Sequence, residues 1–166
     1  MKLFGKIAVI GVGLLGASLA KACKERGLVD EVVGYGRNRK NLEKAKELNI
    51  IDYCPDDLSE AVSDADLIVL CTPVSTILPL IQNMISQVKP GVLITDVGSV
   101  KDSVVHGADE VVPEGIFFVG SHPIAGGENS GLEASTANLY QDAKCIVTPT
   151  DKTDTTALKK INALWH

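Results

Sequence analysis

The sequence predicts an α/β fold, a doubly wound and mainly parallel sheet with helices on both faces. Short apolar runs recur along the chain and are almost uninterrupted, as is typical of strands buried on both faces. Stretches with apolar residues at helical spacing separate these runs, which is the alternation of a parallel sheet. The chain has 166 residues, 45% of them hydrophobic and 22% charged, which suits a single domain with its own core.

The first half of the chain contains two strand and helix pairs. Lys6–Val12 is nearly all apolar and predicts the first strand. Leu14–Arg26 has helical spacing, and Gly27 is a typical helix stop. Glu31–Tyr35 is the second apolar run, and Arg39–Leu48 predicts the second helix.

The second half continues the same alternation. The expected strands are the apolar runs Leu67–Cys71, Val92–Val97, Ile116–Gly120 and Cys145–Thr148. The expected helices have apolar residues on one face and cover the stretch after Pro73 through Met84, Val100–Val111 and Ala157–Trp165. No repeat and no linker interrupts the pattern, so residues 1–166 are expected to form one domain.

Unusual residue clusters follow the strands at one edge of this sheet. In a doubly wound sheet, ligands bind beyond the carboxyl ends of the strands. Each cluster lies on a segment that leaves such an end: Gly11–Gly16, Gly34–Asn38, Thr72–Ser75, Asp96–Lys101 and Ser121–Glu128. The sequence therefore predicts one ligand site at that edge.

The first of these segments is a glycine fingerprint for dinucleotides, of the Rossmann type. Gly11 permits a tight turn, Gly13 lets the backbone approach a pyrophosphate, and Gly16 lets helix pack closely on strand. The helix that starts at Leu14 and Leu15 offers free N–H groups and a positive dipole end to the phosphates.

The end of the second strand bears on which dinucleotide binds. NAD-binding proteins usually have an acidic residue there, for the ribose 2′-hydroxyl. Here the run is Gly34-Tyr35-Gly36-Arg37-Asn38-Arg39, without an acid, and Arg37 and Arg39 can donate to a 2′-phosphate. Alternatively, these cations are a solvated helix start. We expect Gly36, Arg37, Asn38 and Arg39 to bind the cofactor, with NADP favoured and NAD possible.

Two further loops carry candidate polar contacts. Thr72 and Pro73 turn the chain over the dinucleotide, where Thr72 contacts the ribose or, alternatively, Thr72 or Ser75 caps the next helix. Ser99 is a candidate helix cap and a candidate partner for a catalytic group. Lys101 reaches phosphate or substrate, or is simply solvated.

His122 is the candidate catalytic residue. It follows the Ile116–Gly120 run, Pro123 restrains its backbone, and Gly126 and Gly127 allow a ligand to approach closely. Imidazoles titrate near neutral pH, which suits removal of a proton from a hydroxyl during hydride transfer. A lone histidine is nevertheless more often structural than catalytic.

Composition disfavours several other classes of function. The net charge is −5 and no basic stripe is present, which argues against a nucleic-acid partner. No apolar run approaches the roughly 20 residues of a membrane span. The four cysteines show neither C-x-x-C pairing nor metal-ligand spacing, so we expect buried thiols, no metal and a cytoplasmic protein.

Several of these motifs together resemble the prephenate/arogenate dehydrogenase family of tyrosine biosynthesis. The motifs are Gly11–Ala20 (GVGLLGASLA), Cys71–Pro73 (CTP), Thr95–Lys101 (TDVGSVK), Gly120–Gly131 (GSHPIAGGENSG), Leu139-Tyr140 and Thr148–Thr150. The resemblance implies an NAD(P)-dependent oxidative decarboxylation of prephenate to 4-hydroxyphenylpyruvate, or of arogenate to tyrosine.

The resemblance also implies roles for single residues. His122 would accept the proton of the substrate 4-hydroxyl, and Ser99 would orient His122 and touch substrate or nicotinamide. Glu128 would contact the substrate, although a lone loop glutamate can equally be solvated. Gly127 stands where many relatives have threonine, so a polar contact made there is missing or supplied otherwise.

Members of this family continue into a helical second domain that dimerises, and the full-length protein is expected to be a homodimer. The sequence is expected to be a cofactor domain that stops before that helical domain, weakly active or inactive by itself. Two alternatives remain open: another dehydrogenase or reductase of the hydroxyacid or imine type, and a dinucleotide-binding module without catalysis.

Overall fold

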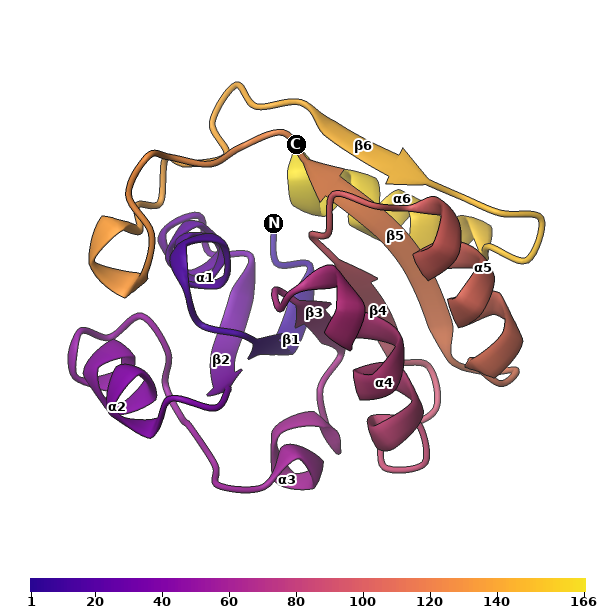
Figure 1. Cartoon of the computed structure of the whole chain (residues 1–166), viewed down its shortest axis with the longest axis horizontal. Coiled ribbons are helices and arrows are strands. Elements are labelled where there is room, and N and C mark those ends of the chain that lie inside the picture. Colours follow the sequence, from indigo (N-terminus) through magenta and orange to yellow (C-terminus); the bar gives the residue numbers. More distant parts are fainter.

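The computed structural model describes residues 1–166 as one six-stranded sheet with helices on both of its faces (Figure 1). The strands are β1 (Phe4–Ile10), β2 (Val29–Tyr35), β3 (Leu67–Leu70), β4 (Leu93–Asp96), β5 (Phe117–Pro123) and β6 (Cys145–Thr148). The helices are α1 (Leu14–Glu25), α2 (Arg39–Glu47), α3 (Leu58–Val62), α4 (Val74–Met84), α5 (Asp102–Val111) and α6 (Thr155–Trp165), with a 3₁₀ turn, η1, at Leu132–Ala134.

The strands lie in the order β2-β1-β3-β4-β5-β6. The first five strands are parallel, and β6 runs antiparallel to β5. Outside β2, Tyr53 forms a single parallel bridge to Val33. If this bridge is counted as a reduced third strand, the order is that of the Rossmann fold, 3-2-1-4-5-6, with one antiparallel strand added. The predicted fold class is confirmed.

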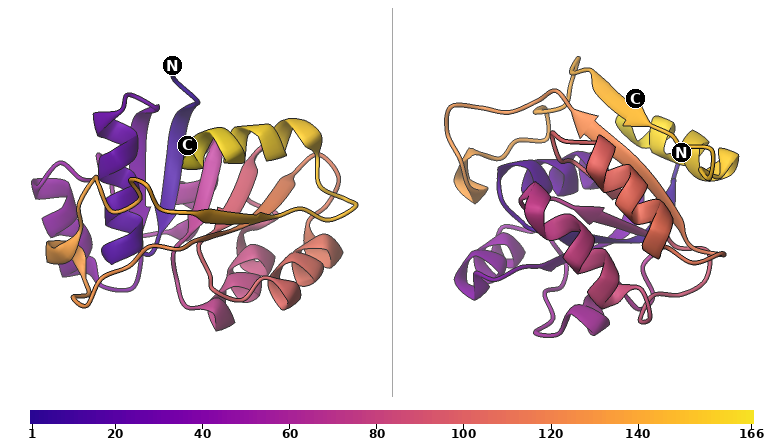
Figure 2. Two further views of the ribbon diagram at one scale, coloured as in Figure 1. Left: turned by 90° about the horizontal axis from the view of Figure 1, so that it is seen from above. Right: turned by 45° about the vertical axis from the view of Figure 1, so that its right-hand side comes forward.

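The core has two layers, one on each face of the sheet (Figure 2). Ile7 and Val9 of β1 face the layer formed by α1, α2 and α6, while Ala8 and Ile10 face the layer formed by α3, α4 and α5. All four residues of β3 are buried, as expected for a central strand covered on both sides.

The main difference from the sequence prediction is the end of β5. The prediction ended this strand at Gly120, but the structure extends it through Pro123, because β6 pairs with Gly120–Pro123 from the antiparallel side. His122 therefore lies inside the strand, opposite Ile146, rather than in the loop after it. The other predicted ends agree within two residues, whereas α3, with five residues, is too short for its periodicity to be recognised.

The segment between β5 and β6 passes over α1 before it returns to the sheet (Figure 1). Lys21 Nζ donates to the carbonyl of Ser135 at 2.7 Å, and the N–H of Thr136 donates to Ser18 Oγ at 3.0 Å. Further along, the hydroxyl of Tyr140 donates to the carbonyl of Leu15 at 2.8 Å. The chain that follows His122 is thus anchored on the helix that begins at the glycine fingerprint.

A carboxylate joins three segments at the amino-end edge of the sheet. Asp66 Oδ2 accepts from the N–H groups of Gly5 (2.8 Å) and Lys6 (3.0 Å), and Lys89 Nζ donates to Oδ1 at 2.6 Å. Burial alone would raise the pKa of Asp66, but the bonds from Lys89, Lys6 and Gly5 outweigh it and the pKa lies below its usual value.

Replacing Asp66 with Asn is expected to lower the free energy of unfolding at pH 7 by about 1–2 kcal/mol, because the amide loses the ion pair with Lys89 and the charge that strengthens the bonds from Gly5 and Lys6. The lowered pKa means that this stabilisation is present above about pH 4 and is lost as the pH falls through the folded-state value. Urea unfolding at pH 7 and pH 3 measures the difference.

The matched control is Asp64→Asn, which removes only an exposed ion pair with Lys6 and should change stability by less than about 0.5 kcal/mol. Equal effects of the two variants at pH 7, or an undiminished Asp66 effect at pH 3, would contradict this assignment.

Candidate functional site

The glycine fingerprint brings α1 into direct contact with the end of β1. A Cβ atom on Gly16 would lie 2.1 Å from the carbonyl oxygen of Gly11, so no larger residue fits there. Gly11 itself has φ +96°, and a Cβ there would lie 2.7 Å from the carbonyl oxygen of Cys71. Both positions therefore require glycine for the sharp turn between strand and helix.

The start of α1 is open to an anion. Its first N–H groups, including those of Leu14 and Leu15, have no partner within the helix. The N-cap residue Gly13 provides no side-chain bond, and no acidic residue lies in the first turn. A Cβ atom on Gly13 would meet nothing within 4 Å, so space remains in front of these N–H groups. The fingerprint thus fits a pyrophosphate at a helix N-terminus.

A cleft of about 890 Å³ extends from this point along the ends of β1, β2 and β3. It brings together most of the predicted cofactor residues, namely Gly11, Gly13, Gly36, Arg37, Asn38, Arg39, Thr72 and Pro73. The cleft is also lined by residues that were not predicted from sequence, among them Tyr35, Lys40, Asn41, Thr76 and Leu80. Leu14, Leu15 and Gly16 form the first turn of α1 beside the cleft.

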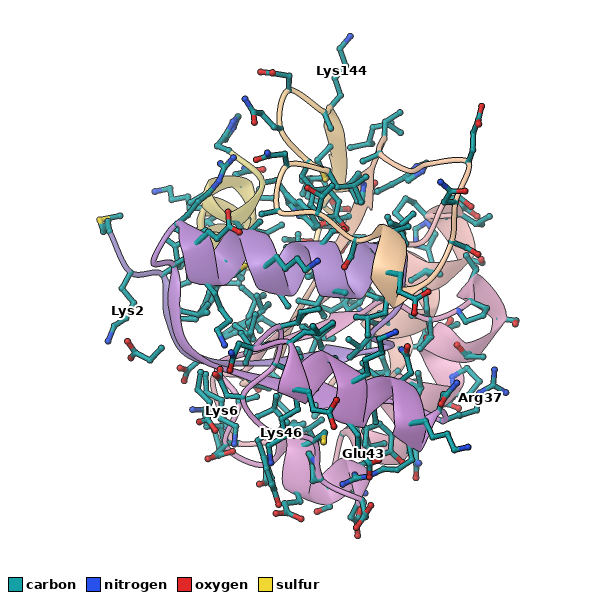
Figure 3. The ribbon with its side chains drawn as sticks, turned by 90° about the vertical axis from the view of Figure 1, so that its left-hand side faces the viewer. Lys2, Lys6, Arg37, Glu43, Lys46 and Lys144 are labelled. Atoms are coloured by element: carbon teal, nitrogen blue, oxygen red, sulfur yellow. The ribbon has the colours of Figure 1, made fainter.

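The two arginines after β2 have different surroundings. The Arg39 guanidinium donates to the carbonyl of Cys54 at 2.7 Å and pairs with Glu43 at 3.2 Å and Asp56 at 3.0 Å. Arg37 is exposed and makes no hydrogen bond or ion pair within the chain. Figure 3 shows Arg37 at the edge of the molecule opposite Lys2. Of the two, Arg37 is the arginine that is free to meet a ligand.

Two asparagines hold the beginning of α2 against the glycine loop. The side chain of Asn38 caps α2 by accepting from the N–H of Asn41 at 3.0 Å. Asn41 Nδ2 in turn donates to the carbonyl of Val12 at 2.7 Å. Asn41 was not predicted from sequence; its signal is an asparagine in the first turn of the helix that borders the cleft.

The loop after β3 does not contain the expected helix cap. The N-cap residue of α4 is Pro73, which has no side-chain cap bond, so neither Thr72 nor Ser75 caps the helix. Instead, the hydroxyls of Thr72 and Thr76 are hydrogen-bonded at 2.8 Å on the cleft wall. Thr72 therefore remains a candidate contact for the ribose.

The ends of β4 and β5 meet at a buried carboxylate. Asp96 accepts from the N–H of Gly98 at 3.0 Å and from the N–H of Ser121 at 3.2 Å. Lys101 Nζ pairs with the same carboxylate and donates to the carbonyl of Ser121 at 3.0 Å. Lys101 was expected from sequence to reach phosphate or substrate, or to be solvated. The structure contradicts both expectations, because its ammonium group is bonded to Asp96 and Ser121 inside the chain.

Ser99 and His122 directly follow Gly98 and Ser121, whose N–H groups both donate to the Asp96 carboxylate. The structure therefore brings these two predicted residues to neighbouring positions. Ser99 is exposed and does not cap α5, because that helix begins only at Asp102. His122 is half-buried, and no hydrogen bond joins it to Ser99. Both lie at the carboxyl edge of the sheet, beside but not within the cleft.

His122 lies on the α5 face of β5. A Cβ atom on Gly120 would lie 2.6 Å from Val105 of α5, and His122, two residues further along a strand, lies on the same face. Exposed apolar side chains adjoin it, since Ile146 is its partner in the register and Ile124 is two residues further on.

The last two predicted residues lie in the loop after β5. Gly127 and Glu128 are exposed, and Glu128 makes no ion pair. A Cβ atom on Gly127 would meet only Asn129, at 3.7 Å, which is an ordinary contact. A larger residue is thus accommodated at this position.

The four thiols are unpaired, and no three metal-ligating side chains gather in one place. Burial raises the pKa of Cys23 to about 12 and that of Cys145 to about 11, so these two thiols stay protonated at neutral pH. None of the helices combines the length and the hydrophobicity that a membrane span requires.

The fold and the open helix start define a Rossmann-type dinucleotide-binding domain. Residues 19–166 match the family described as "Prephenate dehydrogenase, nucleotide-binding domain". The chain belongs to the prephenate dehydrogenase family, as the sequence motifs had indicated.

Individual relatives agree with this assignment. The chain is 39% identical over 166 residues to the cyclohexadienyl dehydrogenase of Zymomonas mobilis, covering 100% of this chain and 56% of that protein. It superimposes on prephenate dehydrogenase of Aquifex aeolicus, crystallised with hydroxyphenyl propionate and NAD+, with a TM-score of 0.90 and 34% identity over 97% of this chain and 56% of the other.

A third match is Synechocystis arogenate dehydrogenase, with a TM-score of 0.87 and 36% identity over 96% of this chain and 55% of the other. The chain thus spans about half the length of the relatives that it matches.

Gly13→Ala is expected to leave the fold intact and to weaken dinucleotide binding at least tenfold, because the added methyl group occupies the open space before the α1 N–H groups. Fluorescence titration with NADPH and NADH measures the affinity, and thermal unfolding measures the stability.

Gly16→Ala is the matched control. It should lower the free energy of unfolding by about 1–3 kcal/mol or more, because its Cβ would collide with the Gly11 carbonyl. Unchanged binding by Gly13→Ala would place the phosphates elsewhere.

Proposed function

We propose that this chain is the dinucleotide-binding part of an NADP-dependent enzyme that oxidatively decarboxylates prephenate or arogenate. The observation that carries the proposal is the position of His122, at the same sheet edge as the open start of α1. Family membership supports the same reaction, because the relatives are named cyclohexadienyl, prephenate and arogenate dehydrogenases.

The chemistry divides between the dinucleotide and the chain. The start of α1 and the cleft beside it would hold the dinucleotide, whose nicotinamide would supply an acceptor for the hydride on the ring carbon that bears the 4-hydroxyl group. His122 accepts the hydroxyl proton, so that this carbon becomes a carbonyl. When carbon dioxide leaves, the electron pair of the broken carbon–carbon bond enters the ring, which becomes aromatic, and the carbonyl oxygen takes up a proton to form the phenol. The half-buried place of His122, among exposed apolar residues, suits a base that meets a carbocyclic ring.

Ser99, Gly127 and Glu128 lie on the loops that flank His122. In the proposed enzyme Ser99 contacts substrate or nicotinamide, and Glu128 contacts substrate beside Gly127. The resemblance to the family further implies a homodimer, and the unpaired thiols support a cytoplasmic location as part of this proposal.

The preference for NADP rests on the end of β2. Gly36 and the exposed Arg37 follow this strand, where NAD enzymes usually carry an acid. Lys40 on the same cleft wall adds positive charge, whereas Arg39 is already paired with Glu43 and Asp56. NAD+ is the dinucleotide in the Aquifex aeolicus structure, so NAD is the alternative that a titration must exclude.

His122→Asn is expected to lower kcat for prephenate or arogenate by about 10²–10⁴-fold, because the proton acceptor is lost, while the Kd for NADPH changes less than twofold. Absorbance at 340 nm measures turnover in the protein that carries this chain. His106→Asn, an exposed histidine on α5, is the control and should have wild-type kcat. If turnover survives His122→Asn, another group takes the proton; if wild type turns over neither substrate, a binding module is favoured.

Arg37→Ala is expected to raise the Kd for NADPH about 10- to 100-fold, the equivalent of one or two charge-assisted hydrogen bonds, and to leave the Kd for NADH unchanged. Arg39→Ala should have a smaller effect, because its guanidinium is already bonded within the chain. Paired titrations with the two dinucleotides measure both. Tighter NADH than NADPH binding by the wild type would overturn the preference for NADP.

A further inference from the structure

The residue before His122 is held at every polar group that it has. The N–H of Ser121 donates to Asp96 Oδ1 at 3.2 Å, and its carbonyl accepts from Lys101 Nζ at 3.0 Å. Its hydroxyl lies 2.9 Å from Thr95 Oγ1 and accepts from Trp165 Nε1 at 3.1 Å. Ser121 is completely buried, so no water competes for these bonds.

These contacts take the place of backbone hydrogen bonds from β4, which ends before it reaches the level of Ser121. The register between β4 and β5 stops at Thr95 opposite Val119, two residues short of Ser121. Beyond that point the inner edge of β5 has no backbone partner, although its outer edge still pairs with β6. The side chains of Asp96 and Lys101 supply the acceptor and the donor that the next residues of a longer β4 would have supplied.

The charges of this pair are well enclosed. Asp96 is 0% exposed and the Lys101 side chain 10% exposed. Burial raises the pKa of Asp96 and lowers that of Lys101, and in each case the charge of the partner opposes the shift. The stem of Lys101 passes beneath Gly120, where a Cβ atom would lie 3.6 Å from Lys101 Cδ. The ammonium group is thus held between the Asp96 carboxylate and the Ser121 carbonyl.

We propose that Lys101, together with Asp96, is a positioning residue for His122. The ion pair bonds both backbone groups of Ser121, and through Gly98 it also holds the turn that carries Ser99. A shift of about 1 Å in a catalytic group can reduce a rate about a hundredfold. The inference rests on the proposed function for the role of His122. The hydrogen bonds that Asp96 and Lys101 make to the backbone of Ser121, which we call the clamp, can be tested without turnover.

The test uses Lys101→Met in the protein that carries this chain. Methionine keeps the length of the apolar stem and removes the donor. Lys89→Met is the matched control, because Lys89 likewise pairs with an aspartate that accepts two backbone N–H groups, but at the opposite edge of the sheet. Both variants lose an ion pair, and only one of them loses a contact to Ser121.

Three quantities are measured for each variant: kcat and KM for the substrate, Kd for NADPH, and amide hydrogen exchange at Ser121 and His122. Lys101→Met should lower kcat at least tenfold, change Kd less than twofold, and speed exchange at the two amides at least tenfold. Lys89→Met should leave kcat and both amides unchanged. A purely structural role would instead affect both variants alike.

A second variant covers the case in which Lys101→Met does not fold. Asp96→Asn combined with Lys101→Met leaves no unpaired buried charge, keeps an acceptor for the Ser121 N–H and still lacks the donor to its carbonyl. It should show the same loss of kcat and faster exchange at His122.

Wild-type kcat with unchanged exchange in either folded variant would overturn the proposal. If the wild type turns over neither prephenate nor arogenate, the proposed function fails, and the exchange data still decide whether the clamp exists.

Discussion

The closeness of α1 to β1 is the constraint on which the site depends. Gly16 packs against the carbonyl of Gly11 with no room for a methyl group, and this contact sets where the N–H groups of α1 point. The same helix anchors the chain after His122, through Leu15, Ser18 and Lys21. A displaced α1 would therefore move the phosphate site and the support of the histidine segment together.

Two carboxylates make the same kind of contacts at opposite ends of the strands. Asp66 accepts two backbone N–H groups and pairs with Lys89, and Asp96 does the same with Lys101. They differ in burial, because the side chain of Asp66 is 38% exposed and that of Asp96 is 0% exposed. At Asp66 the hydrogen bonds from Lys89, Lys6 and Gly5 outweigh the effect of burial, so its pKa is lowered, whereas at Asp96 burial prevails and the pKa is raised. The first pair stabilises the fold, and the second fixes the position of the β5 backbone at Ser121.

The fold could be predicted from the sequence because its signals are local. The buried run Leu67–Leu70 and the glycine spacing of Gly11–Gly16 each identify an element without any knowledge of its neighbours. The extension of β5 through His122 could not be predicted in this way, because it depends on β6, more than twenty residues further along the chain.

The sequence did not show how the side chains at the candidate site pair with one another. Arg37 and Arg39 are both basic residues at the end of β2, but Arg39 is bonded to Glu43, Cys54 and Asp56, and the last two lie more than ten residues further along the chain. For Lys101 a usable signal did exist: an aspartate at the end of an apolar strand, Asp96, with a lysine five residues later. An acid buried by its strand needs a partner, and the next cation in the chain is the natural one.

A charged pair beside a catalytic edge needs a physical reason, because buried ion pairs add little net stability once their desolvation is included. The reason lies in the early end of β4. A longer β4 would satisfy the backbone of β5, but its extra residues would take the place of the turn that carries Gly98 and Ser99. Apolar side chains would leave that turn in place but could not bond the N–H and carbonyl of Ser121. Asp96 and Lys101 meet both requirements, so that β5 stays fixed up to His122 while the edge beside it stays free for a ligand.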